Sequence, residues 1–208
     1  ERIKKYLQLF GWGNPTGVDL AGEIPGLLPD PAWKESYFQD PQRKIWRIGD
    51  TYNISIGQGD ISVTPLQVVM AFSSIANGGK LYQPVFVKEI VQGSSDSLKT
   101  IQKVEPKIIR ENFISEKSLN VVREGMRDGV IYGSSITLSD LPVKAASKTG
   151  TAQTPRKDIF HNWVSVFAPY ENPEIVLTVL IEDVPGIQFA ALPVAKDVLS
   201  WYFAPPEQ

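Results

Sequence analysis

The sequence contains no cysteine and a single histidine, His161, among its 208 residues. The lack of cysteine excludes disulfides and thiolate metal sites. Any metal centre or Ser-His-Asp triad would have to be built around His161 alone. Because no second metal-ligand candidate lies near it, we expect His161 to be a structural histidine at the start of a strand. We therefore expect no bound metal and no cofactor.

The chain also lacks an excess of basic residues and any long apolar run. Its 21 lysines and arginines face 23 acidic residues, which gives a net charge of -2. This balance gives no support to nucleic-acid binding, so no nucleic-acid partner is expected. No apolar run approaches the roughly 20 residues of a membrane span, and no signal peptide is visible. The length suffices for one large domain or two small ones.

Two segments have helical patterns with clear ends. Apolar residues recur along residues 3–10 at helical spacing, and Gly11 follows as a stop. Thr64 is a good N-cap, and Pro65 suits the first position of a helix that runs to about Ala76. Apolar side chains cover nearly the whole circumference of this second helix, so we expect it to be buried. Since the chain opens inside an amphipathic helix, we expect it to be a fragment.

The remaining pattern mixes strands with helices. The segment 11–33 is rich in Gly, Pro, Asn and Asp and is expected to form turns and extended pieces. Residues 175–182 are almost continuously apolar, as expected of a central strand with both faces covered. Together the segments predict an α+β fold, an antiparallel sheet with helices packed on it. The predicted elements are a hairpin of strands 85–91 and 99–104 with a turn at 92–97, a helix from Ser115 to Gly129 or Gly133, strands 143–153, 161–168 and 175–182, and a helix over 190–203.

The stretch Lys148-Thr149-Gly150-Thr151 interrupts a run of small residues in the predicted strand 143–153. Strand alternation puts Lys148 and Gly150 on one face and the two threonines on the other. At an edge strand beside a cleft, Gly150 leaves room for a substrate backbone to lie against the strand. Lys148 supplies positive charge, the hydroxyls can bind a carboxylate, and the Thr151 N–H can serve an oxyanion hole. The pattern suits attack on an acyl group of a peptide; the alternative is a surface strand with a solvated lysine.

A second glycine-rich stretch, Gly57-Gln58-Gly59, precedes the helix that begins at Pro65. Such a stretch before a helix suggests a phosphate cradle. It lacks the third glycine and the Lys-Ser/Thr pair of a P-loop. The phosphate cradle therefore stays an alternative to a purely structural loop.

Four stretches of the chain resemble one family. "KTGTAQ" at 148–153 resembles the third motif of class B penicillin-binding proteins, the serine acyl-enzyme transpeptidases. "GDTYNISIGQGDISVTPLQVVMAFSSIANGG" at 49–79 resembles their glycine-rich loop and buried helix. "GNPTGVDLAGEIPGLLPDPAWK" at 13–34 is similar to the elongation-type members, penicillin-binding protein 2. "HNWVSVFAPYENPEIVLTVLIE" at 161–182 resembles the strand pair after K-T-G, so the resemblance covers nearly the whole chain in family order.

The resemblance implies a penicillin-binding protein/β-lactamase-like transpeptidase fold that is incomplete at its N-terminal side. Residues 1–208 would be the C-terminal part of one transpeptidase domain. The implied activity is that of a serine-type DD-transpeptidase, which cross-links peptidoglycan stem peptides at D-Ala-D-Ala and is acylated by β-lactam antibiotics. Other cell-wall elongation proteins are implied as partners. The implied location is the extracytoplasmic (periplasmic) face of the bacterial inner membrane, with an anchor in an N-terminal segment outside this chain.

Site residues follow from the matching motifs. The resemblance implies that Lys148, Thr149, Gly150 and Thr151 are catalytic. The implied substrate-binding residues are Lys148, Thr149, Thr151, Gln153, Gly57, Gln58 and Gly59. By the same resemblance, Lys148 orients and polarises the serine of the second motif and attracts the substrate carboxylate.

The family's other two motifs are not found in order. No serine stands three residues before a lysine, as the nucleophile motif S-x-x-K requires. The T-x-x-K stretches at 100–103 and 154–157 lie in a predicted hairpin strand and a loop, and we do not expect them to replace it. Ser118-Leu119-Asn120 matches the S-x-N motif in letters, but it lies within a helix and in the wrong order. We expect both motifs upstream of Glu1 and the 208 residues alone to be inactive.

Other functions on the same fold remain open at the level of sequence. A non-catalytic β-lactam-binding sensor or scaffold module would keep K-T-G without the reaction. A hydrolytic carboxypeptidase or β-lactamase would share all three motifs and differ in the access of water. An S-x-x-K motif upstream of the chain would favour an enzyme.

Overall fold

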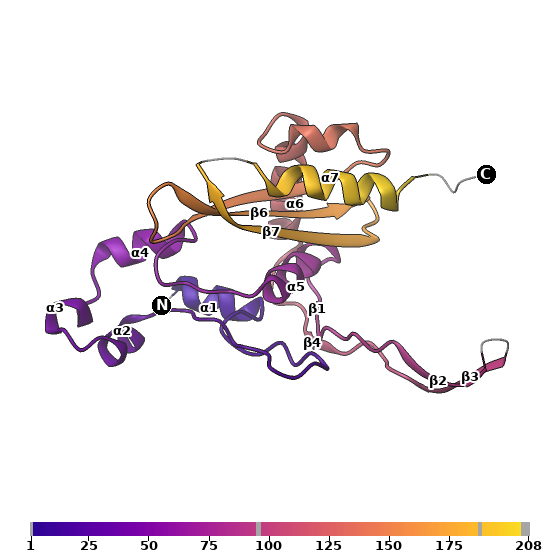
Figure 1. Cartoon of the computed structure of the whole chain (residues 1–208), viewed down its shortest axis with the longest axis horizontal. Helices are drawn as coiled ribbons and strands as arrows, with labels where there is room; N and C mark the ends of the chain where they lie inside the picture. Colours follow the sequence, from indigo (N-terminus) through magenta and orange to yellow (C-terminus); the bar gives the residue numbers. More distant parts are fainter. Residues whose placement is uncertain (1, 95–96, 187–188, 205–208) are drawn as a thin grey trace.

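A three-stranded antiparallel sheet lies at the centre of the computed structural model, which describes residues 2–94, 97–186 and 189–204. The strands are β5 (Ala146–Gln153), β6 (Ile159–Ala168) and β7 (Ile175–Pro185), in the order β5-β6-β7. Helix α7 (Ala191–Tyr202) packs on one face of the sheet and α5 (Pro65–Ala76) on the other (Figure 1). The α+β architecture predicted from the sequence is confirmed.

Strand alternation along β6 divides the core between the two faces. Val164, Val166 and Ala168 are buried in a cluster with residues of α7. Phe167 points to the opposite face and packs with Ala76 at the end of α5. Both faces of the central strand are therefore covered by helices, and this burial fixes the register of the sheet.

The expectation that residues 175–182 form the central strand is wrong. Within the described residues, β7 has one neighbour, β6, and β6 is central. The apolar run of β7 has another cause, since Leu177 packs against the α7 cluster and Val176 against the cluster that includes Ala76 of α5. Both faces of β7 are covered although β7 is the last strand of the described sheet, so its sequence resembles that of a central strand.

Helix α5 begins at the predicted cap. The Thr64 hydroxyl accepts a hydrogen bond from the Gln67 N–H at 3.1 Å, and the Gln67 side chain accepts one from the Thr64 N–H at 3.0 Å. This capping box satisfies two N–H groups at the start of the helix. The buried Gln67 Nε2 also donates to the carbonyl oxygens of Asn14 at 2.9 Å and Pro25 at 2.8 Å. Gln67 thereby ties the N-terminal segment to α5.

The N-terminal part of the chain forms helices around an irregular segment. The predicted first helix is α1 (Arg2–Leu9). The expected irregular segment after it extends to Asp30. A backbone bridge between Leu27 and Ser62 holds this segment to the loop before α5. Three further helices follow that the sequence analysis did not predict, namely α2 (Pro31–Tyr37), α3 (Pro41–Lys44) and α4 (Ile48–Ser55).

The predicted hairpin projects from the body of the molecule (Figure 1). It consists of β2 (Glu89–Ser94) and β3 (Ser97–Lys103), and residues 95–96 of the expected turn lie outside the described residues. At its base, β1 (Leu81–Tyr82) pairs with β4 (Ile108–Arg110).

The predicted helix after the hairpin is α6 (Glu116–Ile131), and Ser115 caps it by accepting a hydrogen bond from the Ser118 N–H at 3.1 Å. A short 3-10 helix, η1 (Ile136–Asp140), leads from α6 towards β5. None of the helices in the described ranges is long and apolar enough to cross a membrane.

Candidate active site

Strand β5, which carries Lys148-Thr149-Gly150-Thr151, forms an edge of the central sheet. It pairs with β6 on one side, with Gly150 opposite Trp163, and no described strand pairs with its other side. Helix α6 covers the start of that side, where Arg127 donates to the Ala145 carbonyl oxygen at 2.8 Å. The edge position that the sequence analysis required for peptide addition is therefore present.

A cleft of about 690 Å³ opens beside β5, on the face of the sheet that carries α5. Its β-sheet wall contains residues 148–152 of β5, together with Trp163 of β6. The facing wall is made by the loop over 56–64 and by Val68 and Phe72 of α5. Most of these side chains are apolar, so Lys148 stands at a cleft with a largely hydrophobic lining.

The four predicted catalytic residues all line this cleft. The exposed Lys148 ammonium group donates to the carbonyl oxygen of Thr149 at 2.5 Å. The Thr149 hydroxyl lies 2.8 Å from the hydroxyl of Ser134, which comes from the loop after α6. The sequence analysis did not identify Ser134, because no local sequence signal indicates that the loop after α6 contacts β5.

Gln58 contacts β5 rather than open solvent. Its Nε2 donates to the Thr151 carbonyl oxygen at 2.9 Å, and its Oε1 accepts from the Gln153 N–H at 3.1 Å. The carboxamide therefore binds two backbone groups on the side of β5 away from β6. The side chain of Gln153 is exposed, and it is the backbone of this residue that takes part in the contact.

The phosphate cradle suggested for Gly57-Gln58-Gly59 is wrong. The Gly57 N–H donates to the Ile54 carbonyl oxygen at 3.0 Å, and the Gln58 N–H donates to the Asn53 carbonyl oxygen at 2.8 Å. Both groups close the end of α4, so neither is free to bind an anion. Gly57 lines the cleft, whereas Gly59 lies against Asn53, where a Cβ would approach the Asn53 Cβ to 3.1 Å.

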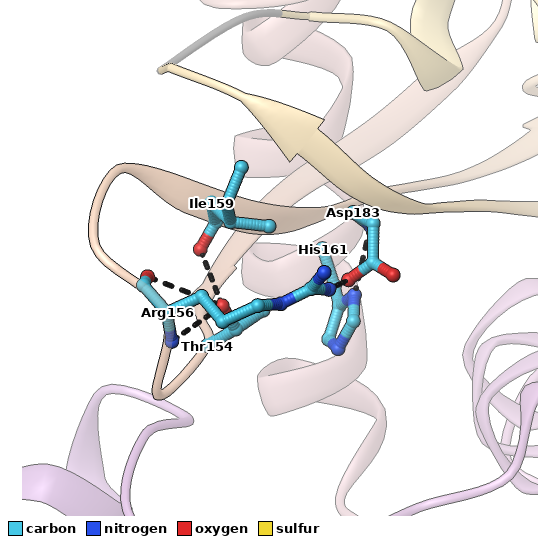
Figure 2. A network of polar contacts seen from close by, with 5 residues as sticks. All are labelled: Thr154, Arg156, Ile159, His161 and Asp183. Carbon is cyan, nitrogen blue, oxygen red and sulfur yellow. Dashed lines mark hydrogen bonds and ion pairs between the residues drawn. The ribbon is translucent and has the colours of Figure 1, made fainter.

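His161 lies opposite Ala152 of β5 and is among the residues that line the cleft. It also belongs to a network of polar contacts (Figure 2). The Asp183 N–H donates to His161 Nδ1 at 3.3 Å, and Arg156 forms an ion pair with the Asp183 carboxylate. Thr154 joins the network through its hydroxyl, which donates to the Ile159 carbonyl oxygen at 2.9 Å. The structural role of His161 stays a prediction. Within the described ranges, no three acidic or histidine side chains gather as a metal site.

The stretches that imitate the missing motifs lie elsewhere. Ser118 Oγ contacts Ser115 Oγ at 2.8 Å in the first turn of α6. Thr100 donates to Glu89 at 2.8 Å within the β2–β3 hairpin. Neither these residues nor Thr154 line the cleft beside β5.

Shifted pKa values occur at structural carboxylates outside the cleft. The N–H groups of Phe86 and Val87 hold the pKa of Asp19 below its ordinary value. Burial raises the pKa of Asp50, but hydrogen bonds from Lys34 and the Arg47 N–H outweigh this effect, so the pKa is lowered overall. Lys34 and Asp50 form an ion pair at 2.6 Å that joins α2 to α4.

Comparison with known proteins places these features in a family. Residues 1–200 match the model of the penicillin binding protein transpeptidase domain. The chain is 30% identical over 215 residues to the peptidoglycan D,D-transpeptidase MrdA of Haemophilus influenzae, covering 97% of this chain and 32% of that protein. The chain thus spans about a third of the length of the curated relatives it matches.

Solved structures give the same result. The complex of penicillin-binding protein 2 with MreC from Helicobacter pylori matches with a TM-score of 0.74 and 32% identity, over 96% of this chain and 34% of that one. The imipenem acyl-enzyme complex of penicillin-binding protein A from Mycobacterium tuberculosis matches with a TM-score of 0.71 and 25% identity, over 94% and 40% of the two chains. The chain therefore belongs to the penicillin-binding protein transpeptidase domain family.

Proposed function

We propose that the chain is the C-terminal part of the transpeptidase domain of an elongation-type peptidoglycan DD-transpeptidase. The observation that carries this proposal is the position of Lys148-Thr149-Gly150-Thr151 on an edge strand that lines an open, largely apolar cleft. No serine in the 208 residues stands three residues before a lysine. The nucleophilic serine and the S-x-N motif therefore come from a segment of the protein outside this chain.

In the proposed reaction, the serine oxygen forms an ester bond with the carbonyl carbon of the penultimate D-Ala. The peptide bond to the terminal D-Ala breaks, and that residue leaves after its nitrogen takes up a proton. An amine of a neighbouring stem peptide then attacks the ester, forms the new peptide bond and restores the serine hydroxyl. This sequence is the covalent catalysis typical of an acyl-enzyme.

The residues of β5 would act on the charged parts of this reaction. Lys148 attracts the terminal carboxylate of the substrate and orients the serine of the second motif, while the hydroxyls of Thr149 and Thr151 bind that carboxylate. The Thr151 N–H donates to the oxyanion that develops on the attacked carbonyl oxygen, where a preorganised donor has its largest effect. Gly150 leaves room for the substrate backbone, which lies along the strand.

The backbone of β5 supports this mode of binding. In an antiparallel ladder, alternate residues direct both backbone groups to the same side. The carbonyl oxygens of Ala145 and Thr151 accept hydrogen bonds from groups outside the sheet. By the same alternation, the N–H and C=O of Thr149 and the N–H of Thr151 face away from β6, where an extended peptide can pair with them.

Two solved relatives support the proposed ligands and partners. Penicillin-binding protein 2 of Helicobacter pylori forms a complex with MreC, and penicillin-binding protein A of Mycobacterium tuberculosis forms an acyl-enzyme with imipenem. We extend these observations to this chain: its substrates are D-Ala-D-Ala stem peptides, and β-lactams acylate the same serine. The parent protein works at the periplasmic face of the inner membrane with other elongation proteins, through an anchor outside this chain.

The test is to supply the full-length protein with a D-Ala-D-Ala stem peptide and an acceptor peptide, and to measure released D-Ala and cross-linked dimer. Release of D-Ala together with dimer formation is the expected result. Release without dimer would identify a hydrolytic carboxypeptidase. Penicillin binding without any release would identify a sensor or scaffold, and either outcome contradicts the proposal.

A further inference from the structure

The carboxamide of Gln58 already occupies part of the β5 edge that faces away from β6. It donates to the Thr151 carbonyl oxygen at 2.9 Å and accepts from the Gln153 N–H at 3.1 Å. A residue of an added strand would use the same two kinds of group to pair with β5. We propose that Gln58 is a specificity-determining residue that closes the β5 edge beyond the Thr151 N–H and limits how far an extended peptide can pair. This inference rests on the proposed function.

The contact is built into the fold. The N–H groups of Gly57 and Gln58 bind carbonyl oxygens at the end of α4, at 3.0 and 2.8 Å, and fix the start of the loop. Gly59 has a φ of +81° and lies so close to Asn53 that a Cβ would come within 3.1 Å of it. Glycine adopts such a conformation without strain and leaves room for this close approach. The hydrogen bonds before Gln58 and the contact of Gly59 after it therefore hold the loop against α4. The half-buried side chain of Gln58 thus presents the carboxamide to β5 from a fixed base.

The other end of the same edge is closed as well. Arg127 of α6 donates to the Ala145 carbonyl oxygen at 2.8 Å, and Gly129 packs so closely that a Cβ there would lie 3.3 Å from the Ser147 carbonyl oxygen. The open part of the edge is therefore a window that contains the N–H and C=O of Thr149 and the N–H of Thr151. The Thr149 carbonyl oxygen accepts from Lys148, but a carbonyl oxygen has a second lone pair for a peptide N–H.

The limits of this window affect the N-terminal side of a bound peptide. A peptide that pairs antiparallel with β5 runs from the Gln153 end towards the Ala146 end, so its N-terminal residues approach Gln58. The D-Ala whose carbonyl oxygen binds the Thr151 N–H lies opposite Thr151, so its own N–H reaches the second lone pair of the Thr151 carbonyl oxygen. A short acyl group ends there and leaves the Gln58 carboxamide in place on the Gln153 N–H. A longer peptide has to displace it, and the hydrogen bonds that it gains at β5 replace those that Gln58 loses. The exchange brings little net gain in affinity, so wild-type protein discriminates weakly in favour of long substrates.

The test compares two D-Ala thioesters in the full-length protein: an N-acetylated form and a form extended at its N-terminus with stem-peptide residues. Gln58→Ala frees the Gln153 N–H, which only the long thioester can reach. The ratio of kcat/KM for the long over the short thioester should rise about fivefold, mainly through a lower KM, as expected for about one additional net hydrogen bond. Gln102→Ala, at an exposed position of β3, is the control and should leave both rates unchanged.

Backbone hydrogen exchange reports on the same contact without catalysis. The Gln153 N–H should be protected in the wild-type protein and exchange faster in Gln58→Ala. A fast-exchanging Gln153 N–H in the wild type, an unchanged ratio, or an equal change for both thioesters would overturn the role of Gln58 alone. If neither thioester acylates the wild-type protein, the proposed function fails, and this inference fails with it.

Discussion

Lys148 is held in place by its strand, but the strand does not depend on it. Its ammonium group is exposed and donates to the carbonyl oxygen of the adjacent Thr149. The strand is fixed by its ladder with β6 and, at its start, by the buried Ala145 and Ala146. Because Lys148 contributes little to the stability of the fold and lines a cleft, it is a candidate functional residue.

We predict that Lys148→Ala in the full-length protein slows acylation by penicillin about a hundredfold, because an electrostatic contact at a preorganised site is lost. The melting temperature should hardly change, since exposed strand lysines contribute little to stability. Lys99→Ala, at an exposed position of β3, is the matched control and should change neither quantity. The measurements are second-order acylation rates and melting curves. Acylation of Lys148→Ala at the wild-type rate would make Lys148 the solvated lysine of an ordinary surface strand.

At the scale of elements, the N-terminal segment is tied to the rest of the fold by a few polar side chains. Gln67 is fully buried in α5 and binds the carbonyl oxygens of Asn14 and Pro25 and the N–H of Thr64. Asp19 binds the N–H groups of Phe86 and Val87 at 2.7 and 2.9 Å, next to the β2–β3 hairpin. These contacts hold the irregular N-terminal segment against α5 and against the residues before β2.

Gln67→Leu tests the first of these ties. The substitution keeps the volume of the side chain but removes the partner of two carbonyl oxygens and one N–H in part-buried hydrogen bonds. Such a group costs about 1–3 kcal/mol when it is left unsatisfied in a buried place. Because the groups can relax towards water, we expect a loss of roughly 2–4 kcal/mol in the free energy of unfolding, measured with urea. Gln102→Leu on the exposed face of β3 should change it little. A near-neutral Gln67→Leu would contradict the role of this side chain.

The second tie should depend on pH. Hydrogen bonds from the N–H groups of Phe86 and Val87 hold the pKa of Asp19 below its ordinary value of 3.8. A group whose pKa is lowered on folding stabilises the fold above its unfolded pKa and loses this effect as the pH falls through the folded pKa. Wild-type protein should therefore melt higher than Asp19→Asn at neutral pH, and the two curves should converge in acid. A difference that stays constant down to the most acidic pH would contradict this assignment.

Local chemistry predicted those elements whose signals lie within a few residues of one another. Thr64 and Pro65 predicted the start of α5, and Ser115 predicted the start of α6, as the structure has them. Asp30 before Pro31 carries the same kind of signal for α2, but that helix has 7 residues, too few for a periodic apolar pattern.

The relations between distant segments could not be predicted in this way. The place of β7 at the end of the described sheet depends on the order of strands, which hydrophobicity does not encode. The contacts of Gln58 with β5 join residues that are 93 and 95 positions apart, and Ser134 reaches Thr149 across η1. The sequence therefore identified the strand that carries the site. Identifying the residues that contact this strand, such as Gln58 and Ser134, required the three-dimensional structure.

At the scale of the whole molecule, the cleft is the central feature. Its walls come from β5, β6, β7, the loop before α5 and α5 itself, together with Trp12 and Ile24, so segments far apart in the sequence form it together. Apolar side chains such as Trp163, Val68 and Phe72 line it around the exposed Lys148. A largely apolar cleft with a few polar groups at one wall is typical of a ligand site. In the proposed enzyme, the segment with the nucleophilic serine completes this cleft.

The most direct test of the central claim is to treat the full-length protein and the isolated 208-residue chain with penicillin and to map the adduct by peptide mass spectrometry. The proposed function predicts a covalent adduct on one serine of the full-length protein, outside these 208 residues, and none on the isolated chain. An adduct on a side chain within the 208 residues, or no adduct on the full-length protein, would contradict it.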